Sequence, residues 1–405
     1  MTEERRCEVA VIGAGMLGAS AARHLADAGC DVVLVGQAEP TDRQTHRGVF
    51  ASHHDVARVS RTIDPDPVRA WLGHRSVSQF ADVAARTGID PVNPVGHLWV
   101  DSPAGIDLLA EADVRYGLCC QRRGAAEAIE SMGFLSLPDE CETLWEPPPA
   151  GSVDPRAHVA SETAAAVAAG ATHVVALVGS VLDGAVGPVS VSTDVGVISA
   201  DRVLLATGAF SGYGTSPAAG LDLEYALHTQ LLVDLGAAEV DRLAGMPSII
   251  GKFPDPVDDF YLTPPVPDQL VGHPPGSGDR HILKVGVPED DHVRATADEL
   301  VDWFRTDGDP EVAARLERIL GGLLPGLRDM GRRTTSCVTT YTPSGFPFID
   351  LLGDQVKGRI YCAIGGNGFA AKCAPALGEL AAGLILGRDW PTEVDRELFR
   401  ARFLG

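Results

Sequence analysis

A glycine-rich turn near the start of the chain constrains the fold more than any other feature of the sequence. Residues 8–12 predict a short buried strand, and the turn Gly13-Ala-Gly-Met-Leu-Gly18 follows it directly. An apolar helical stretch then ends at Gly29, and residues 31–35 predict a second strand. A strand, a glycine turn, a helix and a strand within about 30 residues are typical of a dinucleotide-binding unit, whereas the glycine motif alone would be weak.

The residue types of this turn fit a bound pyrophosphate. Gly13 permits the tight turn, Gly15 lets backbone amides approach the phosphates, and Gly18 lets the helix pack close to the strand. The N-terminus of the helix adds partial positive charge. We therefore predict that Gly13, Gly15, Met16, Leu17 and Gly18 bind a dinucleotide. A tight turn without a ligand is the alternative.

The end of the second strand departs from the dinucleotide-binding pattern. An acidic residue there usually binds the ribose hydroxyls, but this sequence has Val35-Gly36-Gln37-Ala38-Glu39. Gly36 has no side chain for that bond. We therefore count Gln37 among the cofactor-binding residues, with Glu39 as the alternative ribose contact.

The overall charge argues against several partners. The 405-residue chain has 33 Lys+Arg against 55 Asp+Glu, and its formal net charge of −22 disfavours nucleic acid and anionic membranes. Its apolar runs are shorter than the roughly 18 residues of a membrane span, and the N-terminus does not read as a signal peptide. Eight cysteines without a CxxC pair predict neither a disulfide scaffold nor a structural zinc site. We expect a cytoplasmic enzyme without a metal, as a monomer or small homo-oligomer.

A second glycine turn lies near the end of the chain. A strand ends at Ala206-Thr-Gly208, and Gly365-Gly-Asn-Gly368 leads from a strand at 361–364 into an apolar helix at 369–386. The cofactor domain is therefore predicted to be assembled from separated segments, with a largely β domain between them. The remaining pattern predicts helices at 66–88, 107–132, 156–170 and 296–324, a strand at 95–100, β-structure over 172–207, and a loop with a short strand over 254–278.

With these features the chain resembles the D-amino-acid oxidase superfamily of flavoproteins. Within it, the monomeric sarcosine oxidase and N-methyl-amino-acid oxidase branch is nearest, and glycine oxidases are more distant. The resemblance covers nearly the whole chain and is thin at 101–150 and 265–280. The glycine motif does not separate NAD from FAD, but the resemblance implies FAD.

The resemblance also implies the fold class, which is α/β. An FAD-binding Rossmann-like (GR2-type) domain is expected from the discontinuous segments 1–88, 150–215 and 330–405. A second, α+β substrate domain with a mixed or antiparallel sheet is expected from 89–149 and 216–329.

The strongest specific match is Cys337-Val-Thr-Thr-Tyr-Thr-Pro343. Sarcosine-oxidase relatives have a cysteine, a Thr-rich run and then a proline at this spacing, and their cysteine forms a thioether to the flavin. The resemblance therefore implies covalent flavin at Cys337. A buried structural cysteine is the alternative.

A lysine motif implies a site for dioxygen. Ile282-Leu-Lys284-Val-Gly286 matches a stretch in which the lysine of the family lies over the flavin and promotes its reaction with dioxygen. A cation about 4 Å from a superoxide-like anion, at an effective dielectric of about 20, is worth roughly 4 kcal/mol. That corresponds to about three orders of magnitude in rate. The alternative is a surface lysine beside a strand.

Further site residues follow from the same resemblance. Arg58 is placed near the flavin ring and Arg61 against the substrate carboxylate, which a planar guanidinium fork matches. Tyr261, which precedes Pro264, matches a tyrosine of the substrate domain. A solvated ion pair and an ordinary core tyrosine are the alternatives. The other expected cofactor contacts are Ser52, His53, Val174, Thr207, Gly208, Gly365, Gly366, Asn367, Gly368 and Phe369.

Three positions differ from the sarcosine enzymes. Thr339 stands in place of an aromatic residue, Pro288 in place of a histidine and Ala370 in place of a lysine. Lys372 is near the last of these, but two residues along a helix is about 200° around its axis, so we expect it to point elsewhere. These changes predict a roomier pocket, a weaker carboxylate clamp and a substrate larger than sarcosine.

The predicted reaction is FAD-dependent oxidation of the C–N bond of a secondary or N-substituted amino acid to an imine, with dioxygen reduced to hydrogen peroxide. A flavin-dependent dehydrogenase that uses another electron acceptor is the first alternative. A non-catalytic dinucleotide-binding protein is the second. The lack of a GxSxG elbow disfavours a serine hydrolase.

Overall fold

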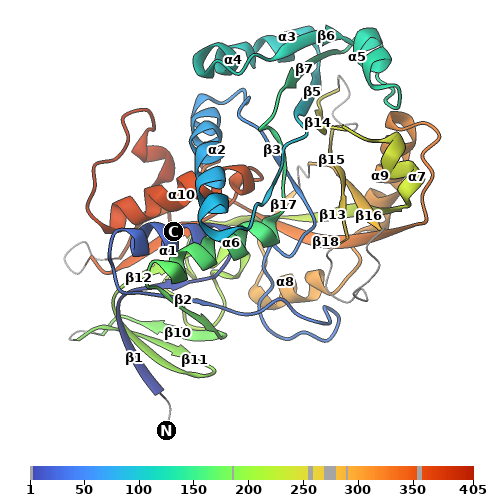
Figure 1. Cartoon of the computed structure of the whole chain (residues 1–405). Coiled ribbons are helices and arrows are strands. Elements are labelled where there is room, and N and C mark those ends of the chain that lie inside the picture. Colours follow the sequence, from blue (N-terminus) through green and yellow to red (C-terminus); the bar gives the residue numbers. More distant parts are fainter. Residues whose placement is uncertain (1–2, 185–186, 254–258, 269–279, 289–290, 354–357) are drawn as a thin grey trace.

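The computed structural model describes residues 3–184, 187–253, 259–268, 280–288, 291–353 and 358–405. An eight-stranded sheet and a nine-stranded sheet organise them, with a three-stranded sheet as the third. Figure 1 shows long helices gathered beside the first sheet, while the second sheet and several shorter helices extend away from it. The strands of the small sheet are β3 (Arg58–Ser60), β4 (Val92–Asn93) and β8 (Gly151–Val153).

The eight-stranded sheet is parallel at its centre. β1 (Glu3–Ile12) pairs in parallel with β2 (Val32–Gly36) on one side and with β12 (Gly196–Leu205) on the other. β20 (Ile360–Ile364) pairs with the C-terminal half of β12. The sheet is therefore assembled from separated parts of the chain, as the two glycine turns predicted. Its other strands are β9 (Thr172–Val175), β10 (Val178–Leu182), β11 (Val189–Thr193) and β19 (Phe348–Leu352).

Helices cover one face of this sheet. Val9, Val11 and Leu34 of its central strands pack against apolar residues of the first and last long helices. The alternate residues Ala10 and Val33 point into a second core on the other face, as the two-residue period of a strand requires. The covering helices are α1 (Met16–Asp27), α2 (Pro67–Thr87), α6 (Pro155–Ala168) and α10 (Ala370–Ile385).

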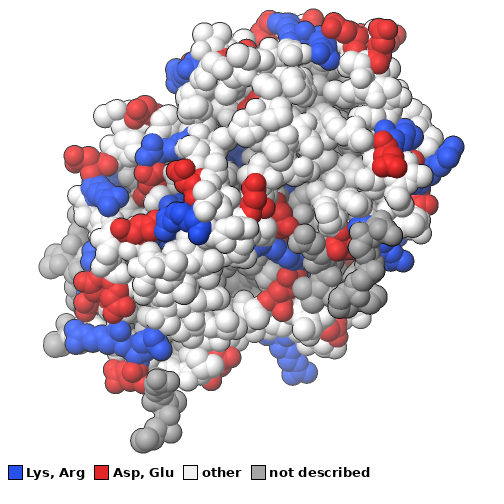
Figure 2. All heavy atoms as spheres, in the orientation of Figure 1, with Lys and Arg blue, Asp and Glu red and all other residues white. Residues whose placement is uncertain are grey.

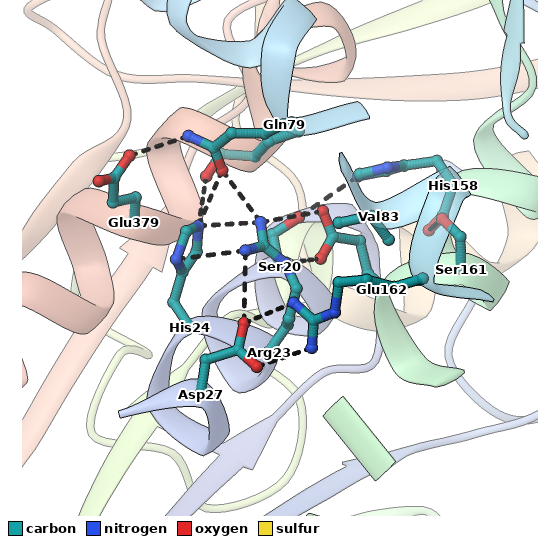
Figure 3. Close-up of polar contacts among 12 residues, drawn as sticks. Ser20, Arg23, His24, Asp27, Gln79, Val83, His158, Ser161, Glu162 and Glu379 are labelled. Atoms are coloured by element: carbon teal, nitrogen blue, oxygen red, sulfur yellow. Dashed lines mark hydrogen bonds and ion pairs between the residues drawn. The ribbon is translucent and has the colours of Figure 1, made fainter. Parts of the chain in front are cut away.

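A buried polar network fastens these four helices together (Figure 3). Arg23 of α1 forms an ion pair with Glu162 of α6, and its Nη2 lies 3.4 Å from Glu162 Oε1. Arg23 also donates to Gln79 of α2, which in turn donates to Glu379 of α10. The Arg23 and Glu162 side chains are 6% and 1% exposed. Each supplies the counter-charge that offsets the desolvation cost of burying the other.

The nine-stranded sheet is mainly antiparallel. Its longest pairing joins β13 (Glu224–Leu235) to β18 (Gly331–Tyr341) over the register from Glu224–Tyr341 to Asp234–Gly331. β18 falls in the segment 330–405 that the sequence assigned to the cofactor domain, so the chain crosses from the nine-stranded to the eight-stranded sheet within this segment. The domain boundaries stay a prediction. The other strands are β5 (His97–Asp101), β6 (Gln121–Gly124), β7 (Glu142–Glu146), β14 (Ser248–Gly251), β15 (Phe260–Pro267), β16 (His281–Gly286) and β17 (His292–Val293).

Two expected helices are interrupted. The stretch 107–132 contains the strand β6, and 296–324 divides because Asp309 caps a new helix that starts at Pro310. Much of 254–278 lies outside the described residues, and its described part holds β15. The shorter helices are α3 (Pro103–Asp107), α4 (Ala110–Tyr116), α5 (Ala125–Met132), α7 (Ala237–Arg242), α8 (Ala297–Phe304) and α9 (Pro310–Leu323), with 3₁₀ turns at Gly208–Phe210 and Arg396–Phe399.

Charged side chains are dispersed over the face drawn in Figure 2 and form no large patch there. On the face drawn in Figure 2, acidic and basic side chains lie in small groups separated by wide uncharged areas, so this face offers no broad basic surface. Within the described part of the chain, no helix has the length and apolar character that crossing a membrane requires.

Candidate active site

One cavity of about 570 Å³ is lined by residues of both large sheets. Its size lies within the range of roughly 300–1,000 Å³ that small-molecule and cofactor sites occupy. The predicted site residues that line it are Gly13, Gly15, Met16, Leu17, Gln37, Ser52, His53, Arg58, Arg61, Thr207, Gly208, Tyr261, Gly365, Gly366, Asn367, Gly368 and Phe369.

Four predicted site residues do not line this cavity. Gly18 is a packing position, because an added Cβ would overlap the Gly13 carbonyl group and lie 3.2 Å from the Ala206 Cβ. Val174 packs into the core of the first sheet, while the nearby residues 176–181 line the cavity. Cys337 and Lys284 are buried beside the cavity wall. Among the described residues, no cluster of His, Cys, Asp and Glu is arranged to hold a metal ion.

The two glycine turns are shaped to receive a dinucleotide. Gly13 has φ +106° and Gly365 has φ +99°, a region that side-chain-bearing residues rarely adopt. α1 begins after Gly15 with no side-chain cap and no acidic residue in its first turn. Its first N–H groups therefore lack side-chain partners and are free to bind phosphate oxygens.

The second turn is held by Asn367. Its Oδ1 accepts from the Thr342 backbone N–H at 3.0 Å, and its Nδ2 donates to the Gly365 carbonyl at 2.8 Å. These bonds fix the backbone between β20 and α10 at the edge of the cavity.

The space at Gly36 explains the missing acidic residue. A Cβ there would lie 2.5 Å from the Ala14 Cβ and 2.7 Å from the Ala14 nitrogen, so no acidic side chain fits. Glu39 is paired with Arg156, whose Nε lies 2.8 Å from Glu39 Oε2. Gln37 accepts from the Val49 N–H through Oε1 and lines the cavity, so it stays the predicted ribose contact.

One wall of the cavity carries two cations around one carboxylate. Asp64 Oδ2 accepts from Arg61 Nη2 at 3.1 Å and from Lys372 Nζ at 2.8 Å. The Arg61 guanidinium lies 4.8 Å from the centre of the Trp99 ring. Burial and the Arg61 charge lower the pKa of Lys372, and Asp64 opposes that shift. Glu146, a second buried carboxylate, also interacts with both cations. Arg58 and Arg69 add positive charge to the cavity lining, which therefore keeps a net positive charge.

The prediction that Lys372 points elsewhere is wrong. It relied on the rotation of about 200° between Ala370 and Lys372, which holds in α10, but the first turn of this helix lies against the cavity, so that Ala370, Ala371 and Lys372 all line it. Side chains in a helix tilt toward its N-terminus, which is where the cavity lies, and Lys372 lines it.

Lys284 belongs to a buried group beside the cavity. Its Nζ donates to Asp55 Oδ2 at 2.7 Å and to the Ala57 carbonyl, and its side chain is fully buried. The same Asp55 oxygen lies 2.8 Å from Arg58 Nε and 3.4 Å from Gln230 Nε2. Burial lowers the pKa of Lys284 to about 8 although Asp55 opposes the shift. Arg58 thus joins the buried group to the cavity wall.

The family follows from a whole-chain match. A family model named DAO and described as FAD dependent oxidoreductase matches residues 8–384. The chain belongs to the DAO family of FAD-dependent oxidoreductases. The predicted cofactor and enzyme class are thereby confirmed.

Known DAO-family proteins resemble this chain along their whole length. It is 23% identical over 402 residues to the N-methyl-L-tryptophan oxidase of Yersinia pestis (strain Pestoides F), covering 98% of this chain and 99% of that protein. Among solved structures, NikD, an amino acid oxidase essential for nikkomycin biosynthesis, is 20% identical with a TM-score of 0.74 and 99% of both chains covered. Glycine oxidase from Geobacillus kaustophilus is 18% identical with a TM-score of 0.67, covering 99% of this chain and 100% of that one. These likenesses confirm the fold class.

The sequence missed two carboxylates of this DAO-family site. Asp55 lies three residues before Arg58, and Asp64 lies three residues after Arg61. That spacing of acid and base around the two predicted arginines was the available signal, and it marks the residues that hold each guanidinium in place.

Cys337 lies beside the cavity, and a covalent link between its sulfur and the flavin can be tested. Its Sγ accepts a hydrogen bond from Arg58 Nη2 at 3.5 Å, and the next residues, Val338 and Thr339, line the cavity. We expect acid-precipitated wild-type protein to retain yellow flavin in the pellet, and Cys337→Ala to release it into the supernatant. Cys362→Ala is the matched control, because Cys362 is buried in β20. Flavin released from the wild type would contradict the covalent link.

Proposed function

We propose that this DAO-family enzyme oxidises the C–N bond of a secondary or N-substituted amino acid, larger than sarcosine, to an imine, with dioxygen reduced to hydrogen peroxide. The amine loses two electrons and two protons. Dioxygen takes up these electrons and protons and becomes hydrogen peroxide. The observation that carries the proposal is the pair Arg61 and Lys372, held around Asp64 on the wall of a cavity that the cofactor-binding turns also line. Bound FAD supplies the two-electron acceptor for the amine carbon.

The residues of this wall are suited to a substrate carboxylate. Arg61 is 12% exposed and its Nε has no hydrogen-bond partner among the described residues, so a donor remains for an incoming ligand. The net positive charge favours an anion, and the guanidinium fork orients it. Trp99 stacks on Arg61 and limits the positions that the fork can adopt. These residues would hold the amine nitrogen and its neighbouring carbon in a fixed place.

The size of the substrate is inferred from three positions on the cavity wall. Pro288, Thr339 and Ala370 all line the cavity, and each replaces a larger or more polar residue of the sarcosine enzymes. Trp99 and Ile250 add apolar surface to the same cavity. A substituent bulkier than a methyl group fits such a wall, in keeping with the relative whose name specifies N-methyl-L-tryptophan.

One observation favours a second function, a dehydrogenase with another electron acceptor. Lys284, the residue expected to promote the reaction with dioxygen, does not line the cavity and is bonded to Asp55. Slow peroxide formation together with fast reduction of an artificial dye would identify that function.

A panel of N-alkylated amino acids with a peroxide readout tests the proposed reaction. In Arg61→Ala we expect the KM of the best substrate and the Kd of carboxylate inhibitors to rise about 10- to 100-fold, because a hydrogen bond to a charged group is worth about 1.5–3 kcal/mol. Arg115→Ala is the matched control, because Arg115 is exposed on α4 and its ion-pair partner among the described residues is Glu111. Unchanged inhibitor binding in Arg61→Ala would remove Arg61 from the site.

A further inference from the structure

Lys284 is a fully buried lysine, with none of its side chain exposed. A buried ammonium group without a counter-charge gives up its proton, because burial penalises the charged form. A neutral amine cannot offer positive charge to dioxygen. The charge of Lys284 therefore depends on the groups that surround it.

These groups come from four elements. Asp55 precedes β3, and Arg58 lies on that strand. Tyr261 is on β15, and its ring centre is 5.8 Å from Lys284 Nζ. Cys337 is on β18. Gln230 of β13 donates to both Asp55 and the Tyr261 hydroxyl. Asp55 is the one carboxylate in this set of described residues, and its Oδ2 is shared by Lys284 and Arg58.

We propose that Asp55 is a positioning residue that keeps Lys284 protonated, and that it thereby sets the pH at which the cation pair Lys284–Arg58 at the cavity wall loses one of its charges. The part that dioxygen plays rests on the proposed function, whereas the effect of Asp55 on the charge of Lys284 is independent of it.

The charge balance of the group supports this assignment. With Asp55 ionised, two cations share one carboxylate, and the group carries a single net positive charge. Without Asp55, Lys284 and Arg58 would repel each other in a buried site. Arginine keeps its proton at all ordinary pH values, so Lys284 is the group that loses its proton.

Lysine NMR measures the proposal directly, because the chain contains only four lysines, Lys252, Lys284, Lys357 and Lys372. FAD-loaded protein labelled with ¹³Cε-lysine is titrated with pH, and Lys284→Met identifies the Lys284 signal. In Asp55→Asn, which keeps the shape of the side chain, we expect the midpoint of that signal to fall by about 1–3 pH units. An unchanged midpoint would overturn the proposal.

The second buried lysine supplies the control. Lys372 is paired with Asp64, so its signal should keep its midpoint in Asp55→Asn. In Asp64→Asn the pattern should reverse, with Lys372 moving and Lys284 staying. If both signals move together in either variant, the effect is a general loosening of the fold and the proposal fails.

Reoxidation kinetics give a second readout. In stopped-flow mixing of substrate-reduced enzyme with dioxygen, we expect the rate constant to fall as pH rises through the Lys284 midpoint, and this fall to be displaced to lower pH in Asp55→Asn by the shift seen in NMR. A lower rate with an unmoved midpoint would show a merely structural role. If no variant reacts with dioxygen, the proposed electron acceptor is wrong, and the NMR titration still decides the role of Asp55.

A double variant covers the case in which Asp55→Asn is too unstable for the pH titration. Asp55→Asn/Lys284→Met no longer buries a lysine without its carboxylate, so its thermal unfolding midpoint should exceed that of Asp55→Asn. Failure of the double variant to recover stability would overturn the proposed coupling.

Discussion

Gly18→Val is expected to leave the protein without FAD. The Cβ of any residue at 18 would overlap the Gly13 carbonyl oxygen, with its carbonyl carbon at 3.1 Å and the Ala206 Cβ at 3.2 Å. Backbone cannot swing aside as a flexible side chain can, so α1 must move away from β1 and take its free N–H groups off the phosphates. Overpacking costs about 1–3 kcal/mol, and valine, with two further methyl groups, should reach at least the upper end. We expect FAD affinity to fall by more than about 100-fold.

Flavin absorbance per protein after purification and reconstitution measures this effect. Gly321→Ala is the matched control, because a Cβ there meets nothing within 4 Å in the helix α9. Alanine has the higher helix propensity, so this control should retain its flavin and gain up to about 1 kcal/mol of stability. Full flavin content in Gly18→Val would show that the first turn does not hold the cofactor.

Glu162→Ala is expected to lower the free energy of unfolding by about 3–5 kcal/mol. Arg23 would lose its buried counter-charge, and the remaining carboxylate, Asp27, lies 3.8 Å away and is itself paired with Arg86. Because Arg23 also bonds to Gln79, the loss reaches α2 as well as α1 and α6. Denaturant unfolding of the flavin-loaded protein gives the value.

Two further variants locate the origin of that loss. Glu111→Ala removes an exposed ion pair with Arg115 on α4 and should change stability by less than about 0.5 kcal/mol. Arg23→Met/Glu162→Leu replaces both buried charges with apolar groups and should recover much of the loss. A Glu162→Ala variant as stable as the wild type would mean that Arg23 finds water or another anion.

The sequence predicted the features that depend on short spacings. The turns at Gly13 and Gly365 are local, because positive φ angles and a following helix are properties of a few consecutive residues. The sharing of Asp64 by Arg61 and Lys372 is different, since it joins residues 308 positions apart. No local pattern shows that pairing.

Lys372 illustrates why an argument from helix rotation can fail at the start of a helix. Ala370 and Lys372 are both in α10 and are separated by about 200° around its axis, yet both line the cavity. The first turn of α10 lies against the cavity, and helical side chains tilt toward that N-terminal end. The rotation between two residues is a local property, whereas the position of the helix end depends on tertiary packing that the sequence spacing does not show.

The parallel pairing of β1 with β12, and of β12 with β20, has a consequence for biosynthesis. The first strand leaves the ribosome about 190 residues before its neighbour Gly196–Leu205, which at roughly 5–20 residues per second is on the order of 10–40 s. The turn at Gly365 comes later still. Flavin capture thus waits until the turn at Gly365 has been made, and until β12 has been synthesised the edge of β1 that it covers must be shielded by something other than that strand.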